Sequence, residues 1–393
     1  MKRIGSGRPL AGLLGSLLLL GVPAVTGCGG GGSTIVPVVP SAPSTPPAPP
    51  VTWTLWGDSL TELGYPPFLA DYTGQKAVNE GVASQTSTEI AVREGGVSTT
   101  VTVAGGEIPT SGSVQVTFST GYSPAAFVSS NLVLGTIEGV EGTTVQDGSG
   151  NFIFTPKTSP STAVTVAPGS PWKPILTGLN TGPVVIWVGR NNFNFPQQVL
   201  SDVAAMVATL PSPKNYVILG VINADYSGIE YKGDPGYNAI VSLNASLAAA
   251  YPDHYFDIRS YLVSHYDPSN PQDVIDFSHD VPPSSMKGIN PYCAGTLTAP
   301  ITSASQTQIS ISQFDLCRTL YIGSEKVEIL SFSGGGNQPG IATVLRGYAG
   351  TTPATYPAGT PFTALDPLHT TALSGSTTTA KGVIAAQQTQ EPK

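Results

Sequence analysis

Ser59 is the residue of this sequence that is best placed to act as a nucleophile. It lies in a Gly-Asp-Ser-Leu tetrapeptide, directly after an apolar run at residues 52–56 that predicts a strand. Where a helix follows such a strand, its free backbone N–H groups favour a developing negative charge. A serine hydroxyl reacts only when a base removes its proton, and an imidazole can take and return that proton at neutral pH. His279 and His369 each stand three residues after an aspartate, so the sequence offers two candidate bases.

Three further segments accompany this serine along the chain. One follows the second predicted strand, one follows the third, and one lies near the C-terminus: residues 79–87 (NEGVASQTS), 189–192 (GRNN) and 366–369 (DPLH). Together with the Gly-Asp-Ser-Leu tetrapeptide, these segments resemble the four sequence blocks of the GDSL, or SGNH, serine hydrolase family. The sequence contains no Gly-x-Ser-x-Gly, which argues against the nucleophile elbow of an α/β-hydrolase.

The resemblance implies a role for each block. It implies Ser59 as the nucleophile, His369 as the base and Asp366 as the catalytic acid that orients the histidine ring. It also implies an oxyanion hole formed by the backbone N–H groups of Ser59 and Ser84 and by the side-chain amide of Asn191. Such donors stabilise the charge that develops on an ester carbonyl oxygen, and one donor contributes about 3 kcal/mol in other hydrolases. This chemistry needs no metal or cofactor, and we expect none.

Ser84 departs from the family pattern, which usually has glycine at this position of the second block. The backbone N–H is retained, but a side chain now stands beside the substrate carbonyl. A positive φ would strain this residue, because only glycine adopts it without steric cost. We therefore expect a reduced rate or a preference for small acyl groups.

His279 competes with His369 for the role of the base. Residues 370–388, which follow His369, fit the helix that closes this block in the family. His279 is followed instead by Val-Pro-Pro-Ser-Ser, in which the prolines prevent a helix from beginning smoothly. We therefore assign the base to His369 and expect His254 and His265 to be surface residues.

The N-terminus predicts export. Three basic residues precede an apolar run at 10–25 that is too short, and too often broken by glycine and proline, to span a membrane. The run ends in Val-Thr-Gly-Cys, which resembles the lipobox of bacterial lipoproteins and implies cleavage before Cys28 and lipidation of Cys28. An ordinary signal peptide with an incidental cysteine is the alternative. Residues 1–28 would be the signal, and residues 29–50 a semi-rigid Gly/Pro-rich linker to a cell-envelope membrane, at the outer membrane or the cell surface.

Cys293 and Cys317 remain if Cys28 carries lipid. An even pair in an oxidising compartment favours a disulfide bond between them, with two unpaired buried thiols as the alternative. No Cys-x-x-Cys occurs, and nothing in the sequence resembles a zinc or iron–sulfur site.

Strands and helices alternate over much of the chain after residue 50. Predicted strands lie at 52–56, 77–82, 184–188, 216–222 and 255–258, and helical spacing of apolar residues predicts helices at 199–210 and 240–251. This alternation favours a mainly parallel sheet, with active groups on loops beyond the carboxyl ends of its strands. The family resemblance implies an α/β fold of the flavodoxin-like three-layer α/β/α class.

Residues 97–172 and 289–364 interrupt this alternation. Each segment is of a size that suffices for a small all-β module. Expected strands lie at 101–103, 114–118, 132–134, 152–154 and 163–166 in the first and at 308–311, 320–322, 327–330 and 341–344 in the second. The second segment resembles small β modules common in phage structural proteins. We expect both segments to be insertions that divide the hydrolase into three parts, 51–96, 173–288 and 365–393.

Composition limits the function further. With 40% hydrophobic residues, the 393-residue chain has enough apolar side chains to fold. Its net charge of −8 lacks the basic surface that a nucleic-acid partner requires. We therefore expect a membrane-anchored carboxylic ester hydrolase that removes O-acyl groups from a cell-surface or extracellular glycan. The alternatives are an esterase for short-chain or lipid esters, an acyltransferase, and a non-catalytic surface binding protein on a decayed hydrolase scaffold.

Overall fold

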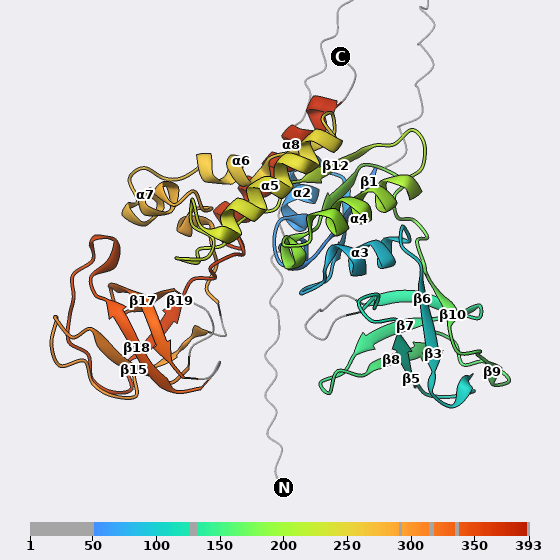
Figure 1. Ribbon diagram of the computed structural model, residues 1–393, viewed down its shortest axis with the longest axis horizontal. Coiled ribbons are helices and arrows are strands. Elements are labelled where there is room, and N and C mark those ends of the chain that lie inside the picture. The colour runs from blue at the N-terminus through green and yellow to red at the C-terminus, as the bar shows by residue number, and fades with distance from the viewer. Residues whose placement is uncertain (1–50, 126–131, 291–292, 314–317, 335–337, 391–393) are drawn as a thin grey trace, which may run out of the picture. The chain divides into compact units, whose positions relative to one another are not determined.

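A parallel sheet holds the serine and the two loops that neighbour it (Figure 1). In this computed structural model its five strands lie in the order β13-β12-β11-β1-β2. They are β1 (Thr52–Gly57), β2 (Lys76–Gly81), β11 (Val184–Trp187), β12 (Tyr216–Leu219) and β13 (Tyr255–Phe256). Every residue of β11 and β12 is buried, as expected for strands covered on both faces. Because β1 lies between β2 and β11, the loops that follow these three strands meet at one edge of the sheet.

The structure describes residues 51–125, 132–290, 293–313, 318–334 and 338–390. They belong to one compact unit, Pro49–Lys393. The expected lipidation site Cys28 and the expected disulfide partner Cys317 lie outside the described residues. Within the described ranges, no helix is both long enough and apolar enough to cross a membrane.

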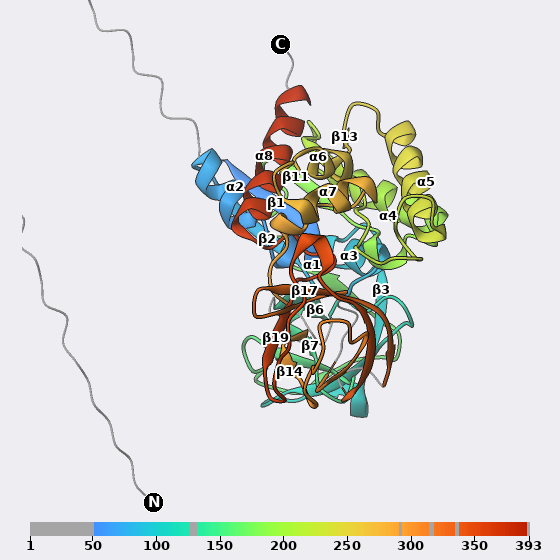
Figure 2. The ribbon, with the colours of Figure 1, turned by 90° about the vertical axis from the view of Figure 1, so that its left-hand side faces the viewer.

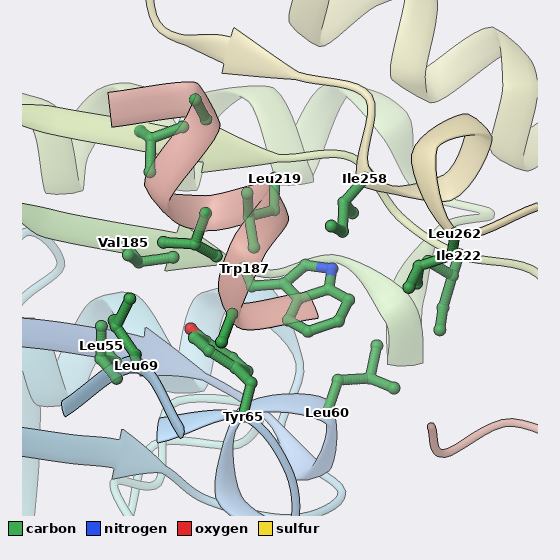
Figure 3. Close-up of a cluster of buried hydrophobic side chains, with 14 of the residues drawn as sticks. Leu55, Leu60, Tyr65, Leu69, Val185, Trp187, Leu219, Ile222, Ile258 and Leu262 are labelled. Atoms are coloured by element: carbon green, nitrogen blue, oxygen red, sulfur yellow. The ribbon is translucent and has the colours of Figure 1, made fainter. Parts of the chain in front are cut away.

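Helices pack against both faces of the parallel sheet. On one face, α1 (Ser59–Glu62), α2 (Pro66–Thr73), α6 (Ile258–Ser264) and α8 (Leu373–Gln390) contribute to the first apolar cluster. Trp187 and Tyr65 belong to this cluster, with ring centroids 5.8 Å apart (Figure 3). Helix α8 packs against α2 (Figure 2). On the other face, α3 (Ser87–Glu94), α4 (Pro196–Thr209) and α5 (Pro235–Ala250) contribute to a second cluster.

A closed antiparallel barrel follows α3. Its strands, in the order β10-β3-β5-β8-β7-β6, are β3 (Thr99–Val103), β5 (Val114–Phe118), β6 (Val133–Ile137), β7 (Val140–Gln146), β8 (Phe152–Pro156) and β10 (Ser170–Pro174). A two-stranded pair, β4 (Glu107–Ile108) and β9 (Val164–Thr165), accompanies it. Alternate residues point inward around Trp172, and a Cβ on Gly135 would lie 2.3 Å from that ring. Closure removes free edges, which would otherwise expose unpaired backbone groups.

A six-stranded antiparallel sheet precedes the C-terminal helix. Its strands, in the order β14-β19-β16-β17-β18-β15, are β14 (Gly295–Thr296), β15 (Gln308–Ile311), β16 (Thr319–Ile322), β17 (Glu325–Ser333), β18 (Gly340–Leu345) and β19 (Pro361–Ala364). Cys293 is buried in the core of this sheet and is disulfide-bonded. Glu325, at the start of β17, forms a buried ion pair with Arg346. Arg346 Nε lies 2.6 Å from Glu325 Oε1, and Arg346 Nη2 lies 2.7 Å from Glu325 Oε2.

The fold class expected from the sequence is wrong. A flavodoxin-like three-layer α/β/α fold does not describe this chain. Most strands of the residues that the structure describes lie in the antiparallel barrel and the antiparallel six-stranded sheet, and parallel pairing there is confined to five strands. The physical reason is the length of the connections. Strands joined by short turns pair antiparallel with their neighbours, whereas parallel pairing needs a long crossover, usually a helix. Among the strands of the described ranges, five have such crossovers between them and pair in parallel.

Candidate active site

Ser59, His369 and Asp366 form a chain of hydrogen bonds. His369 Nε2 lies 2.8 Å from Ser59 Oγ, and His369 Nδ1 lies 3.0 Å from Asp366 Oδ2. An aspartate at Nδ1 fixes the tautomer of the ring, so that Nε2 is free to accept the serine proton. The structure therefore brings together the nucleophile, base and acid predicted from the sequence.

The loop before α1 holds Ser59 in position. Asp58 caps the helix, and its Oδ1 accepts a hydrogen bond from the Leu60 backbone N–H at 2.9 Å. Asp58 is fully buried, and burial raises the pKa of its carboxyl to about 6. Gly57 precedes it, and a Cβ there would lie 2.1 Å from Thr61 Oγ1, so only glycine fits where the strand turns into the nucleophile loop.

Asp366 also organises the turn that carries the base. Its Oδ1 accepts hydrogen bonds from the backbone N–H groups of Leu368 and His369, both at 2.8 Å. Burial alone would raise the pKa of the Asp366 carboxyl. The net effect is a lowered pKa, because hydrogen bonds from His369 and Leu368 and the charge of His369 outweigh the effect of burial. The carboxylate is thus ionised at neutral pH and available to orient the ring.

Two backbone hydrogen bonds fix this turn to other parts of the chain. The Asp366 N–H donates to the Gly288 carbonyl at 2.8 Å, and the Asp225 N–H donates to the Pro367 carbonyl at 2.9 Å. Gly288 follows η3 (Ser284–Met286), and Asp225 lies on the segment after β12. The turn that carries Asp366 and His369 is therefore held by two segments that are distant from it in the sequence.

Ser84 occupies the left-handed region expected to strain it, with φ of +66°. Its side chain is exposed, and its backbone N–H has no hydrogen-bond partner among the residues that the structure describes. The neighbouring Ala83 N–H, in contrast, donates to Glu62 Oε2 at 2.6 Å, which ties this loop to the helix of Ser59. An unpartnered N–H at Ser84 is available to an oxyanion.

Asn191 reaches the same loop from the end of β11. Its exposed side chain donates from Nδ2 to the Gln85 carbonyl at 2.8 Å, next to Ser84. One amide hydrogen is thus used within the protein, and the second remains to bind a substrate oxygen. The structure brings Asn191 beside Ser84, as the predicted oxyanion hole requires.

Asn192 is a positioning residue that the sequence did not reveal. Its buried side chain accepts from the Ser87 backbone N–H at 3.1 Å and donates to Ser87 Oγ at 2.9 Å. Ser87 Oγ donates in turn to Asp202 Oδ2 at 2.6 Å. Asn192 therefore joins the loop of Asn191 to the start of α3, and only its place beside Asn191 could have suggested this role.

Arg93 is a second residue that sequence reasoning missed. Its Nε donates to Gln85 Oε1 at 2.6 Å, and its Nη2 donates to the carbonyls of Gly57 at 3.2 Å and Glu80 at 2.9 Å. Burial lowers the pKa of Arg93 to about 10, so the guanidinium remains charged at neutral pH. Arg93 thus connects the ends of β1 and β2 to the loop of Ser84. An arginine on a helix usually predicts a solvent-exposed position, so the sequence carried no signal for this one.

His279 lies apart from the serine. Its ring stacks on Tyr231 with centroids 4.0 Å apart, and burial lowers its pKa. The Asp276 carboxylate, three residues earlier, accepts hydrogen bonds from the Ser284 N–H at 2.5 Å and Gln272 Nε2 at 3.2 Å. Asp276 and His279 thus make different contacts and do not form a second acid–base pair.

The described residues contain no group of three or more His, Cys, Asp or Glu side chains arranged to hold a metal ion.

Comparisons with known proteins give limited similarity. No family model matches the chain. The chain is 27% identical over 233 residues to the tail spike protein of Salmonella phage epsilon15, a match that covers 53% of this chain and 21% of the phage protein. This chain thus spans about a fifth of that protein's length. A solved structure of a gut microbial diltiazem-metabolizing enzyme matches with a TM-score of 0.31 and 10% identity, over 74% of this chain and 60% of the enzyme. That similarity is too low to support a conclusion about fold or function.

Proposed function

We propose that this protein hydrolyses carboxylic esters through an acyl-enzyme on Ser59, in the manner of the GDSL/SGNH hydrolases that its motifs resemble. The observation that supports this most directly is the hydrogen-bonded arrangement of Ser59, His369 and Asp366. His369 takes the proton as Ser59 Oγ attacks the carbonyl carbon, and then gives it to the departing alcohol. Water, deprotonated by His369, then attacks the acyl-enzyme; the bond from the acyl carbon to Ser59 Oγ breaks, His369 returns the proton to Ser59 Oγ, and the carboxylic acid leaves. The N–H groups of Ser59, Ser84 and Asn191 stabilise the oxyanion in both steps.

The decisive measurement is hydrolysis of p-nitrophenyl acetate by purified protein that begins at Val51. Ser59→Ala and His369→Ala should each lower kcat by roughly 10⁴-fold or more, because the nucleophile and the base act as a unit. His279→Ala is the matched control, since His279 has the same Asp-x-x-His spacing but contacts Tyr231 and not Ser59. The proposal is wrong if Ser59→Ala hydrolyses the ester as fast as the wild type, or if only His279→Ala abolishes the activity.

For the substrate, we infer an O-acyl group on a cell-surface or extracellular glycan. Support comes from the export-type N-terminus and from the two antiparallel β units in the same chain as the catalytic residues, since such units often add binding surfaces. The comparison of acetylated glycans with p-nitrophenyl esters of graded acyl length tests this inference. Faster turnover of long-chain esters than of any acetylated glycan would favour a lipid esterase, and transfer of the acyl group to an added acceptor alcohol in preference to water would favour an acyltransferase.

We also propose that the protein is a cell-envelope lipoprotein anchored through Cys28. The disulfide bond of Cys293 supports an oxidising compartment. Metabolic labelling with an alkyne fatty acid tests the anchor in full-length protein expressed in a bacterium. Label that is present in the wild type and absent from Cys28→Ser supports the proposal, whereas an unlabelled wild type that is secreted in soluble form contradicts it.

A further inference from the structure

A cavity lined by both polar and apolar side chains lies beside the turn that carries the proposed catalytic acid. Its volume is about 280 Å³, near the lower end of pockets that hold small ligands. Helix α7 (Pro271–Ser278) and the segment around η3 form one side, and strands β16, β17 and β19 of the six-stranded sheet form the other. Among its lining residues, Lys287 and Leu365 directly precede Gly288 and Asp366, which are hydrogen-bonded to each other. A ligand in this cavity would therefore lie next to the acid–base turn.

Two buried polar groups that line the cavity have no hydrogen-bond partner. The Lys287 side chain is 1% exposed, and its Nζ makes no hydrogen bond; the nearest carboxylate oxygen, Asp225 Oδ2, is 3.6 Å away. Gln272 is 1% exposed, and its Oε1 accepts no hydrogen bond although its Nε2 donates to Asp276. Buried polar atoms are rarely left unpaired, because the loss of water is then uncompensated. One donor and one acceptor on residues that line the cavity thus lack a hydrogen-bond partner, and Lys287 has only its ion pair with Asp225.

The charges around the cavity favour a neutral ligand. Two ammonium groups, those of Lys287 and Lys326, face three carboxylates, those of Asp225, Asp273 and Asp276. The Arg318–Glu328 pair of the adjoining sheet adds no net charge. An anion would gain from the lysines but would be repelled by the carboxylates, and a cation would meet the two lysines.

The lining also combines apolar and polar surfaces. Ile289 and Leu365 provide apolar contacts, and Tyr321 provides an aromatic ring with Lys326 Nζ 5.6 Å from its centroid. Side chains of Asn270 and two serines add hydrogen-bonding groups. A ring that bears hydroxyl groups at its edge and C–H groups on its face matches such a lining, because each hydroxyl both donates and accepts.

We propose that this cavity binds one neutral sugar unit, whose hydroxyl oxygen accepts a hydrogen bond from Lys287 and whose hydroxyl hydrogen is donated to Gln272. Binding of the sugar does not depend on catalysis. Its assignment to the ester substrate rests on the proposed function, in which the same glycan would present its acyl group to Ser59.

The test uses saturation-transfer NMR and calorimetry with a panel of neutral methyl glycosides (gluco, galacto, manno, rhamno and N-acetylglucosamine), and with galacturonate as the charged probe. The Ser59→Ala protein is used, so that catalysis plays no part. Gln272→Leu removes a proposed hydrogen bond to the sugar, and Lys326→Met removes the ammonium group beside Tyr321 in the cavity wall; each should weaken the best glycoside by about tenfold. Lys381→Met is the matched control, because Lys381 also lies 5.6 Å from a tyrosine ring, that of Tyr72, but does not line this cavity.

The results for the two cavity variants and the control either support or overturn the sugar-binding proposal. Binding of a neutral glycoside that both cavity variants weaken and Lys381→Met does not would support the proposal; melting curves verify that the variants are folded. The proposal is overturned if no neutral glycoside binds, if galacturonate alone binds, or if both folded cavity variants bind as the wild type does. Hydrolysis of p-nitrophenyl acetate by the wild type is measured separately. Failure to hydrolyse the ester would contradict the esterase proposal, whereas failure to bind a glycoside would contradict the sugar site.

Discussion

At the scale of single residues, Ser84 combines a side chain with a backbone conformation that suits glycine. A non-glycine residue in the left-handed region costs about 1–2 kcal/mol. Ser84→Gly removes this cost. It also makes the unfolded chain more flexible, which reduces the gain in folding stability by about 0.5–1 kcal/mol. We therefore expect an increase of up to about 1 kcal/mol in the free energy of unfolding, measured by urea denaturation.

The same substitution should affect catalysis. Without a side chain beside the Ser84 N–H, larger acyl groups have more room, so Ser84→Gly should raise turnover or extend the accepted acyl length. The measurement is kcat for p-nitrophenyl acetate, butyrate and octanoate. Ser84→Ala serves as the control because it keeps the Cβ atom and the strain. Equal acyl-length profiles for the glycine variant and the wild type would contradict this prediction.

Substitution of the neighbouring residues Asn191 and Asn192 should affect different properties, the first the turnover and the second the folding stability. Asn191 is exposed and presents its amide to the loop of Ser84, so Asn191→Ala should lower kcat by about 10²–10³-fold. Its effect on the melting temperature should be small. Asn192 is buried and pairs with Ser87, so Asn192→Ala should cost about 1–3 kcal/mol of folding stability. Kinetics and thermal denaturation of both variants check this, and a reversal of the two phenotypes would show that the roles are exchanged.

Sequence patterns predicted the nucleophile, base and acid of the candidate site. They did not predict the residues that hold the surrounding loops in place through hydrogen bonds. Ser59, Asp366 and His369 stand out because few residue types act as nucleophile, base and acid, and short motifs mark them. Asn192 acts through buried hydrogen bonds to Ser87, 105 positions away, and Arg93 acts through hydrogen bonds to the ends of two strands and to the loop of Ser84. Such bonds depend on tertiary packing, and neither periodicity nor composition predicts them.

At the scale of secondary-structure elements, Glu94 at the end of α3 is held in a buried hydrogen-bond network. Its Oε1 accepts from Asn180 Nδ2 at 3.1 Å and from Thr209 Oγ1 at 2.8 Å, and its Oε2 accepts from the Gly96 N–H at 3.1 Å. Burial raises the pKa of Glu94 to about 8, although these hydrogen bonds lower it in part. The carboxyl therefore joins α3 to α4 and to the loop before β11.

The raised pKa of Glu94 predicts a pH-dependent stability. Its contribution to the free energy of unfolding is fully present below pH 4.5, the ordinary pKa, and is lost as pH rises through about 8. Glu94→Gln cannot ionise, so its loss of stability relative to the wild type should be larger at pH 5 than at pH 9. Urea denaturation at both values measures this. The exposed Glu107→Gln should show no such difference, and parallel curves for Glu94→Gln and the wild type would contradict the prediction.

Local patterns located many elements well. The expected strands at 114–118 and 308–311 have the same limits in the structure, and the strand at 52–56 ends one residue later. The strand expected at 255–258 is shorter, because Ile258 begins α6. Strand β7 was missed, since its glycine and threonines give no simple alternation of apolar and polar residues. Its pairing with β6 and β8 depends on contacts across the barrel, which local patterns do not contain.

At the scale of the whole molecule, two ion pairs of the β units differ in burial. Glu325 and Arg346 in the six-stranded sheet are 0% and 4% exposed, whereas Glu141 and Lys157 in the barrel are 52% and 70% exposed. Buried charges that lose a partner are costly, whereas exposed pairs contribute little.

Removal of the glutamate charge should therefore reduce stability more in the six-stranded sheet than in the barrel. Glu325→Gln should destabilise the six-stranded sheet by about 3 kcal/mol or more, because Arg346 is left without a full counter-charge. Glu141→Gln should change stability by less than about 1 kcal/mol. Hydrogen exchange at the strand amides of each unit measures the local cost. Equal protection losses in the two variants would show that burial does not decide the strength of these pairs.

The overall fold class could not be predicted from the alternation of strands and helices alone. That alternation correctly indicated a parallel sheet between 52 and 258, but the class of the molecule depends on how the remaining strands pair. Barrel closure joins β3 to β10, which are far apart in sequence, and the six-stranded sheet places β14 beside β19. These pairings of distant strands determine the antiparallel architecture.

The long separation between Ser59 and His369 has a consequence for protein synthesis. The two residues of the catalytic hydrogen bond are 310 positions apart, and the six-stranded sheet must be translated before Asp366 and His369 emerge from the ribosome. A nascent chain that stops at Ala364 contains the nucleophile but has neither its base nor its acid. Under the proposed function, hydrolysis through Ser59 can begin only after Asp366 and His369 have been translated.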